Sequence, residues 1–311
     1  MLCANVKKPR LIVILGPTAV GKTAAAIALA RESGGEIVSA DSMQVYRFLD
    51  IGTAKPTLEE QSLVKHHLID VINPDEQFNA AMFIRLAEVI IGNLYDEGKP
   101  IFVVGGTGLY IKALLGGLFD GPDANEDLRG LYRQELKRFG KTYLYEKLKE
   151  RDEQAAAQID RNDIPRIIRA LEVLELCGLS IVEKQRYHNF GDNLYESTKI
   201  GLMMERTELY KRIDQRTERM MEDGLVYEVE GLLSMGYHES LKPMQALGYK
   251  HIARLIKGSC NLEDAIRMIK RDTRHFAKRQ MTWFGADGQI EWFAPSDLDA
   301  VRQKIDHFLS P

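Results

Sequence analysis

The chain of 311 residues contains little cysteine and no long hydrophobic segment. Its three cysteines are Cys3, Cys177 and Cys260, and no two of them form a C-x-x-C pair. This scarcity argues against a disulfide framework and a cysteine-based zinc site, and we expect a protein of the reducing cytoplasm. The apolar run at the N-terminus is confined to residues 11–15. That run is too short for a secretory signal or a membrane span, so we expect no membrane partner.

A strong excess of charge of either sign is also missing. The chain has 42 Lys and Arg against 45 Asp and Glu, which gives a net charge of −3. Overall charge therefore does not indicate a nucleic-acid partner, and that argument depends on local basic clusters. The 45% hydrophobic and 28% charged content is typical of a globular protein, and the length suits one large domain or two.

The most informative feature that is present is a P-loop pattern over residues 16–23, GPTAVGKT. It follows the apolar run 11–15 and precedes an Ala-rich, helix-prone segment, which is the strand–loop–helix context of phosphate-binding loops. Backbone N–H groups of such a loop cradle phosphate oxygens, Lys22 adds a positive charge, and Thr23 offers a hydroxyl to Mg²⁺. The pattern predicts a diphosphate or triphosphate site made by Gly16, Pro17, Thr18, Ala19, Val20, Gly21, Lys22 and Thr23. It leaves open whether ATP is a physiological ligand.

Apolar segments alternate with helix-prone segments along much of the chain. The expected strands cover residues 11–15, 37–40, 67–71, 101–104, 199–204 and 290–293. The expected helices cover residues 78–95 and 261–283, with one or two long helices over residues 207–234. Such alternation is typical of a parallel sheet wrapped by helices, so we predict an α/β fold of the P-loop NTPase kind. Ligands of such sheets bind at the carboxyl ends of the strands.

The character of the chain changes after Gly117. Residues 125–185 are charged and helix-prone and carry no strand signal. We therefore predict an all-helical insertion domain over residues 119–196, and a catalytic core made of residues 10–118 and 197–311. We find no internal repeat in the sequence.

A second-strand acid of the Walker B type is missing. The expected strand 101–104 ends in Gly105-Gly106-Thr107-Gly108, without a carboxylate. Asp41, which follows the strand 37–40, is the nearest candidate. It is suited to holding a metal, to acting as a general base, or to capping a helix, and the residues alone leave these roles open.

Several further motifs come in a fixed order. They are DSMQVYR at 41–47, DIGTAKP at 50–56, HHLID at 66–70, GGTGLY at 105–110, Asn162-Asp163 with Arg166, RALEV at 169–173, ALGY at 246–249 and AKRQMTW at 277–283. Together with the P-loop, this ordered set closely resembles the bacterial tRNA dimethylallyltransferases (tRNA isopentenyltransferases), over residues 10–285. The eukaryotic members carry a C-terminal zinc finger, for which this chain lacks the Cys and His spacing.

The resemblance implies transfer of a dimethylallyl group from dimethylallyl diphosphate to N6 of adenosine 37, beside the anticodon of tRNA. It implies that residues 16–23 hold pyrophosphate as a leaving group, which accounts for the missing Walker B acid. Asp41 then takes the proton from N6, and Thr18 contacts the donor. Lys22, Mg²⁺ and an arginine stabilise the departing diphosphate, and Arg212 and Arg216, four residues apart on one helix face, are the candidates.

A local cluster of basic residues is consistent with a tRNA partner. Arg267, Arg271, Arg274 and Lys278 recur at helical spacing and form one basic stripe, although a solvated helix face has the same pattern. The adenine must leave its stack to react, and Ser42 and Gln44 are placed to recognise its edge. The residues that we expect to contact the tRNA are Asp41, Ser42, Met43, Gln44, Thr107, Arg129, Pro165, Arg166, Ile167, Ile168, Arg169, Gln245, Ala246, Leu247, Gly248, Tyr249, Lys250, Arg271 and Arg274. Pro165 departs from the family, which more often has a polar residue there.

Three other functions compete with this interpretation. An adenylate dimethylallyltransferase uses the same donor, but a small acceptor needs neither the helical insertion nor the basic stripe. A P-loop small-molecule kinase is disfavoured by the missing Walker B acid. A non-catalytic RNA-binding protein does not require Lys22, Thr23 and Asp41 together. We expect a monomer that binds dimethylallyl diphosphate and the anticodon stem-loop of tRNA.

Overall fold

The computed structural model describes residues 8–118, 121–188 and 194–310, and the side chains of 185–188 are outside this description. It forms two compact units: residues up to 115 together with those from 194 onward, and residues 116–193.

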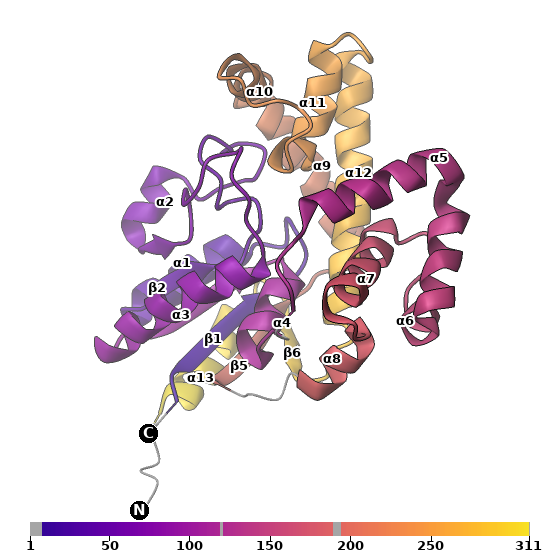
Figure 1. Ribbon diagram of the computed structural model, residues 1–311. Helices are drawn as coiled ribbons and strands as arrows, with labels where there is room; N and C mark the ends of the chain where they lie inside the picture. Colours follow the sequence, from indigo (N-terminus) through magenta and orange to yellow (C-terminus); the bar gives the residue numbers. More distant parts are fainter. Residues whose placement is uncertain (1–7, 119–120, 189–193, 311) are drawn as a thin grey trace, which may run out of the picture. The chain divides into compact units, whose positions relative to one another are not determined.

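The first unit is a parallel α/β fold (Figure 1). Its N-terminal part contains β1 (Arg10–Leu15), α1 (Lys22–Ser33), β2 (Glu36–Ser39), α2 (Leu58–Leu63), β3 (His66–His67), α3 (Ala80–Asp96), β4 (Ile101–Gly105) and α4 (Gly108–Gly116). Its C-terminal part contains β5 (Glu196–Leu202), α9 (Arg206–Glu222), α10 (Leu225–Ser234), the 3₁₀ helix η1 (Pro243–Gln245), α11 (Tyr249–Ile256), α12 (Leu262–Phe284), β6 (Ile290–Phe293) and α13 (Leu298–Leu309).

All six strands run parallel, in the order β3-β2-β4-β1-β5-β6. Alternate residues of the central strand β1 face two different cores: Leu11 and Val13 pack with α3 and α4, whereas Ile12 and Ile14 pack with α1 and α13. Because both faces are covered, the strands are continuous apolar runs, as expected of a parallel sheet. The predicted α/β class is confirmed.

One expected strand is shorter in the structure, and one expected helical segment is now resolved into its helices. The expected strand 67–71 is limited to β3, because Leu68 and Asp70 have φ angles of 61° and 56°, in the left-handed region that ends a strand. The helical segment 207–234 is two helices, since Gly224 at φ 98° separates α9 from α10.

The second unit is entirely helical among its described residues. It contains α5 (Glu126–Arg151), α6 (Glu153–Gln158), α7 (Ile164–Cys177) and α8 (Ile181–His188). Gly140 interrupts α5 with a φ of 83°, and α5 and α7 share a core that includes Tyr132, Leu144 and Leu171. The tRNA-binding role that we assign to this unit stays a prediction.

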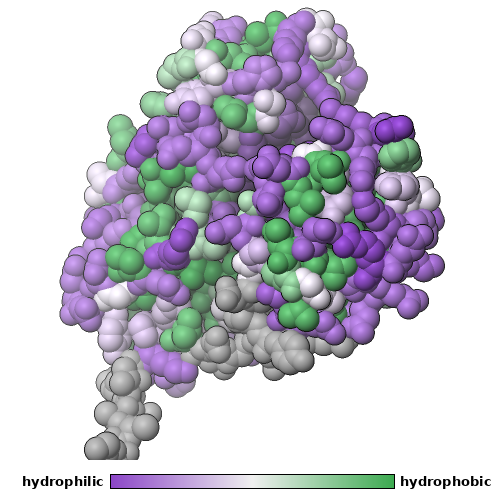
Figure 2. Space-filling model, in the orientation of Figure 1, coloured by the Kyte–Doolittle hydropathy of each residue, from purple (hydrophilic) through white to green (hydrophobic). Residues whose placement is uncertain are grey.

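No helix in the described part of the chain is long and apolar enough to cross a bilayer. On the face shown in Figure 2, hydrophilic side chains interrupt the groups of hydrophobic ones.

Candidate active site

The P-loop takes its shape from its backbone. Gly16, Ala19 and Gly21 all have positive φ angles, of 145°, 66° and 105°. A Cβ on Gly16 would lie 2.5 Å from the carbonyl oxygen of Leu202 on β5, so only glycine fits there. Gly21 is the N-cap of α1 and supplies no side-chain cap, which leaves the first N–H groups of this helix available to an anion.

Lys22 folds back onto this loop. Its Nζ donates to the carbonyl oxygens of Gly16 at 3.0 Å and Pro17 at 2.8 Å. Burial is the main cause that lowers the pKa of Lys22 to about 8; the nearby Asp41 carboxylate acts to raise this pKa, and Arg216 acts to lower it. The ammonium therefore lies in the loop, with the carboxylate close enough to influence it.

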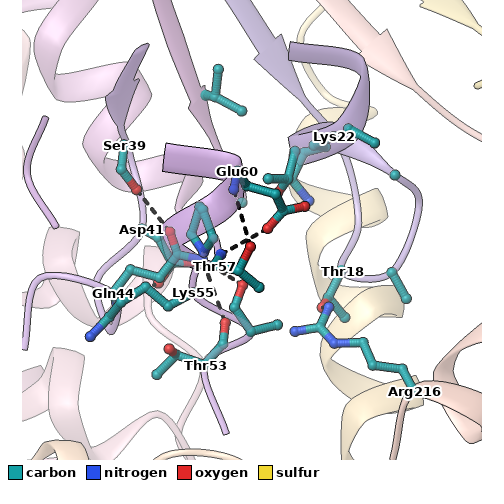
Figure 3. A pocket seen from close by; sticks show the side chains of 18 of the residues that line it. Thr18, Lys22, Ser39, Asp41, Gln44, Thr53, Lys55, Thr57, Glu60 and Arg216 are labelled. Carbon is teal, nitrogen blue, oxygen red and sulfur yellow. Dashed lines mark hydrogen bonds between the residues drawn. The ribbon is translucent and has the colours of Figure 1, made fainter. Parts of the chain in front are cut away.

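The two candidate arginines on α9 differ in their contacts. Arg216 donates from Nη1 to the Thr18 hydroxyl at 3.1 Å, and Figure 3 shows these two side chains pointing toward one another. Burial lowers the pKa of Arg216 to about 10, so the guanidinium stays charged at neutral pH. Arg212 also lines the pocket, but its side chain is 44% exposed and pairs with Glu208. Of the two, Arg216 is the one with a hydrogen bond to the P-loop, although Arg212 is also close to it, since a Cβ on Gly21 would lie 3.9 Å from its Nη1.

Asp41 lies directly after β2 and forms a local turn. Its Oδ1 accepts the backbone N–H groups of Met43 at 2.8 Å and Gln44 at 3.3 Å. No helix begins here, so the alternative role as a helix cap is replaced by a turn of the Asx kind. No described residue donates a hydrogen bond to Oδ2, which leaves that oxygen available for chemistry.

The ends of β2 and β4 are joined beside Asp41. The Ser42 N–H donates to the Thr107 hydroxyl at 3.1 Å, and the Thr107 N–H donates to the Ala40 carbonyl at 3.2 Å. A Cβ on Gly105 would lie 2.1 Å from the Ala40 oxygen, so glycine is required for this approach. The motifs 41–44 and 105–107, far apart in sequence, thus meet at one end of the sheet.

The Gln44 side chain is held at both ends. Its Oε1 accepts a hydrogen bond from the Ser39 hydroxyl at 3.1 Å, and its Nε2 donates to the Ala54 carbonyl at 3.2 Å. The Ser39 hydroxyl and the Ala54 carbonyl belong to two different segments. The orientation of the Gln44 amide therefore depends on the loop that contains Ala54.

These groups surround one cavity of about 890 Å³ within the first unit. Figure 3 shows Thr18 and Arg216 on one side of it in this view, with Asp41 and Gln44 across from them. Its lining includes Thr18, Lys22, Thr23, Ser39, Asp41, Gln44, Ile51, Thr53, Ala54, Gly106, Arg212, Arg216, Arg219 and Gln280. The cavity therefore joins a phosphate-binding loop to a carboxylate with a free oxygen.

Gln280 on α12 is a site residue to which the sequence analysis gave no role. Its Oε1 accepts the Thr18 N–H at 2.8 Å, and its Nε2 donates to the Gly106 carbonyl at 3.0 Å. This nearly buried amide connects the P-loop to the turn after β4. Its position within the motif 277–283 was visible in the sequence, but nothing in that motif indicated its two partners.

In the helical unit, the predicted tRNA contacts divide into two groups. Pro165 and Arg166 are exposed at the start of α7. Ile167 and Ile168 lie in the core of the unit at 0% and 7% exposure, so their hydrophobic side chains are used for packing. Their contact with tRNA stays a prediction.

Arg129 and Arg169 are engaged within the same unit. Both pair with the fully buried carboxylate of Glu172, through Arg129 Nε at 2.8 Å and Arg169 Nη1 at 2.6 Å. Burial acts to raise the pKa of Glu172, but its hydrogen bonds, first from Arg129 and then from Arg169, outweigh burial and lower it. The two arginines thus compensate a buried charge, whatever they contribute to RNA binding.

The predicted tRNA contacts near the C-terminus also differ in exposure. Gln245 is exposed, whereas Gly248 and Tyr249 are buried, and the predicted contact of these residues with tRNA stays a prediction. Met43, Ala246, Leu247 and Lys250 are half-buried. On α12, Arg271 is 61% exposed and pairs with Asp272, while Arg274 pairs with Asp214 of α9.

Comparison with known proteins shows which family shares this arrangement. The family model described as IPP transferase matches residues 44–287, most of the chain. The chain belongs to the IPP transferase family. It is 56% identical to a tRNA dimethylallyltransferase 2 of Syntrophus aciditrophicus, over 99% of each chain.

Solved structures of the IPP transferase family agree with the fold. The full-length tRNA isopentenylpyrophosphate transferase of Bacillus halodurans is 40% identical with a TM-score of 0.72, over 97% of each chain. A eukaryotic dimethylallyltransferase acting on tRNA is 26% identical with a TM-score of 0.78, over 95% of this chain and 77% of its own.

Proposed function

We propose that this chain is a tRNA dimethylallyltransferase, which transfers the dimethylallyl group of dimethylallyl diphosphate to N6 of adenosine 37 and releases diphosphate. The observation that carries the proposal is the single cavity that holds a P-loop and Asp41 in a member of this family. A kinase reaction has less support, because the turn after β4 supplies a glycine pair and no acid.

The donor end stabilises the leaving group. As the allylic C–O bond breaks, its electron pair goes to the diphosphate, and negative charge grows beside the N–H groups that begin α1. Lys22 exchanges its carbonyl partners for phosphate oxygens, and Arg216 reaches the same anion from beside Thr18. These groups lower the energy of the departing diphosphate.

The acceptor end activates the amine. The N6 lone pair forms the new bond to the allylic carbon, and the proton on N6 passes to the free Oδ2 of Asp41. Ser42, Gln44 and Thr107 surround Asp41 and are the groups that we assign to holding the adenine, which reaches them only after leaving its stack.

Magnesium fits the donor end. Among the described residues no three His, Cys, Asp or Glu side chains form a metal cluster, so a cage made by the protein alone is absent there. Mg²⁺ is usually held by few protein oxygens together with substrate phosphates. We assign Thr23 as the hydroxyl ligand, because it lines the same cavity as Asp41. When bound, the ion neutralises charge on the diphosphate.

The monomer stays the proposed oligomeric state. A tRNA substrate supports a location in the cytoplasm.

The test is a choice of acceptor. The protein is mixed with radiolabelled dimethylallyl diphosphate and either unmodified tRNA or AMP, and ATP hydrolysis is measured separately. We expect label in tRNA at adenosine 37 alone, and none in AMP. Label in AMP would establish the free-nucleotide transferase, and ATP hydrolysis without prenyl transfer would establish a kinase-like activity.

A further inference from the structure

Glu228 on α10 binds the loop that forms one wall of the cavity, although it does not line the cavity itself. Its Oε2 accepts the N–H groups of Asp50 at 3.0 Å and Ile51 at 2.8 Å, and its Oε1 accepts that of Gly52 at 3.2 Å. The Tyr249 hydroxyl donates a fourth hydrogen bond to Oε1 at 2.5 Å. Hydrogen bonds to a carboxylate are about twice as strong as neutral ones, so this one side chain fixes three consecutive backbone groups.

The ring of Tyr249 completes the attachment. It is fully buried, and a Cβ on Gly52 would lie 2.4 Å from its Cε2 atom, so the loop reaches the ring because position 52 has no side chain. Burial, with a further contribution from Glu228, raises the pKa of Tyr249 well above its usual value, which keeps its hydroxyl a donor.

The other end of this loop reaches the acceptor residues. We call residues 50–54 the acceptor loop. Its carbonyls at Thr53 and Ala54 accept the Gln44 amide at 3.5 and 3.2 Å, and the Gln44 N–H donates to Asp41 at 3.3 Å. A continuous series of contacts therefore runs from Glu228 to Asp41.

The backbone of the acceptor loop needs external support. Ala54 has a φ of 46°, in the left-handed region that costs a residue with a Cβ energy, and such conformations persist only where the surroundings determine them. Glu228 supplies that support at one end of the loop. The Lys55 ammonium, bonded to the Tyr46 carbonyl at 3.0 Å, supplies it at the other.

We propose that Glu228 is a positioning residue for the acceptor half of the reaction. Through the acceptor loop it holds Gln44 and Asp41 at the distance from the P-loop that an adenine requires. The proposal rests on the proposed function, because the group that it positions is the tRNA adenine. The donor half is held by separate contacts, from Gln280 and Arg216.

The test compares Glu228→Gln with Glu230→Gln. Glu230 lies two residues along the same helix and is exposed, which makes it a matched control. Glutamine at position 228 replaces one carboxylate oxygen by an NH₂ group, which cannot accept the backbone N–H groups. The acceptor loop is therefore expected to shift. We expect kcat/KM for an anticodon stem-loop RNA to fall about 10- to 100-fold, because small misplacements of reacting groups have effects of this size. The KM for dimethylallyl diphosphate should stay within about threefold of the wild-type value, since its contacts are separate.

A second variant keeps the test decisive if Glu228→Gln folds poorly. Gly52→Ala presses a methyl group against Tyr249 and displaces the same loop from the opposite side. It should likewise lower kcat/KM for the RNA and leave the KM for dimethylallyl diphosphate nearly unchanged. Circular dichroism melting curves of every variant measure its stability.

The outcomes distinguish a failure of the positioning role of Glu228 from a failure of the proposed function. Loss confined to the acceptor in Glu228→Gln and Gly52→Ala supports the proposal. Wild-type kinetics in both variants, or a proportional loss for donor and acceptor that follows the melting temperature, overturns it. Absence of label in tRNA with the wild-type protein is instead the failure of the proposed function.

Discussion

The two sides of the cavity are built by different means. The P-loop side depends on backbone geometry, with positive φ angles at Gly16, Ala19 and Gly21 within six residues of chain. The acceptor side depends on side chains from distant segments, including Gln44, Glu228 and Tyr249. The P-loop side is built from neighbouring residues, so it can be recognised as a sequence motif. The acceptor side depends on contacts between distant segments, so it can be recognised only in the folded chain.

The largest expected effect is on the acceptor side, at Asp41. Asp41→Ala removes the proposed base and should lower the rate of transfer about 10²- to 10⁴-fold, with donor affinity unchanged. Asp41→Asn keeps an oxygen that accepts from Met43 and so preserves the turn. Single-turnover transfer to tRNA measures both variants. Near-normal transfer by Asp41→Asn would leave Asp41 as a structural residue only.

The next largest effect separates the two arginines on the donor side. Arg216→Gln should lower kcat by about 10²- to 10³-fold, because it removes a buried donor from the departing diphosphate. Arg212→Gln should lower kcat by at most about tenfold, since its side chain is 44% exposed and screened by solvent. Both variants are measured at saturating donor and tRNA. Equal losses would contradict the assignment of Arg216.

A pH effect of intermediate size is expected from Lys22. Its pKa of about 8 means that the free enzyme loses this positive charge as the pH rises through that value. Donor affinity should be constant below that point and weaken above it, approaching about tenfold for each pH unit. Calorimetry in buffers of different ionisation enthalpy should show proton uptake on donor binding near pH 8. Lys22→Gln provides the control, because it has no proton to gain.

The smallest effect is expected on the surface of α12. Arg271→Glu should weaken tRNA binding several-fold and reduce its dependence on salt, because Arg271 is exposed and its charge is screened. Arg274→Glu should have a larger and less specific effect, since Arg274 pairs with Asp214 and lies 5.5 Å from the Tyr210 ring centroid. Filter binding at several salt concentrations measures both. An affinity that does not change with salt would contradict a phosphate-binding role for this helix.

The same division explains what the sequence could predict. The P-loop, the strands 11–15 and 101–104 and the place of Asp41 follow from local patterns of apolar residues and glycines. Gln280 and Glu228 could not be found in this way, because their importance comes from partners more than 170 positions away in the chain. The burial of Ile167 and Ile168 was not foreseen either, because a motif does not say which of its residues face the core.

The contact of Lys22 with Gly16 and Pro17 has a consequence for ligand selection. An ammonium that already has two carbonyl partners gains little by turning toward a small, weakly charged anion. A ligand must offer several oxygens at once before it is favourable for the Lys22 ammonium to give up its two carbonyl partners. The loop is therefore expected to bind chloride and inorganic monophosphate poorly at ordinary concentrations, and to bind a polyanion.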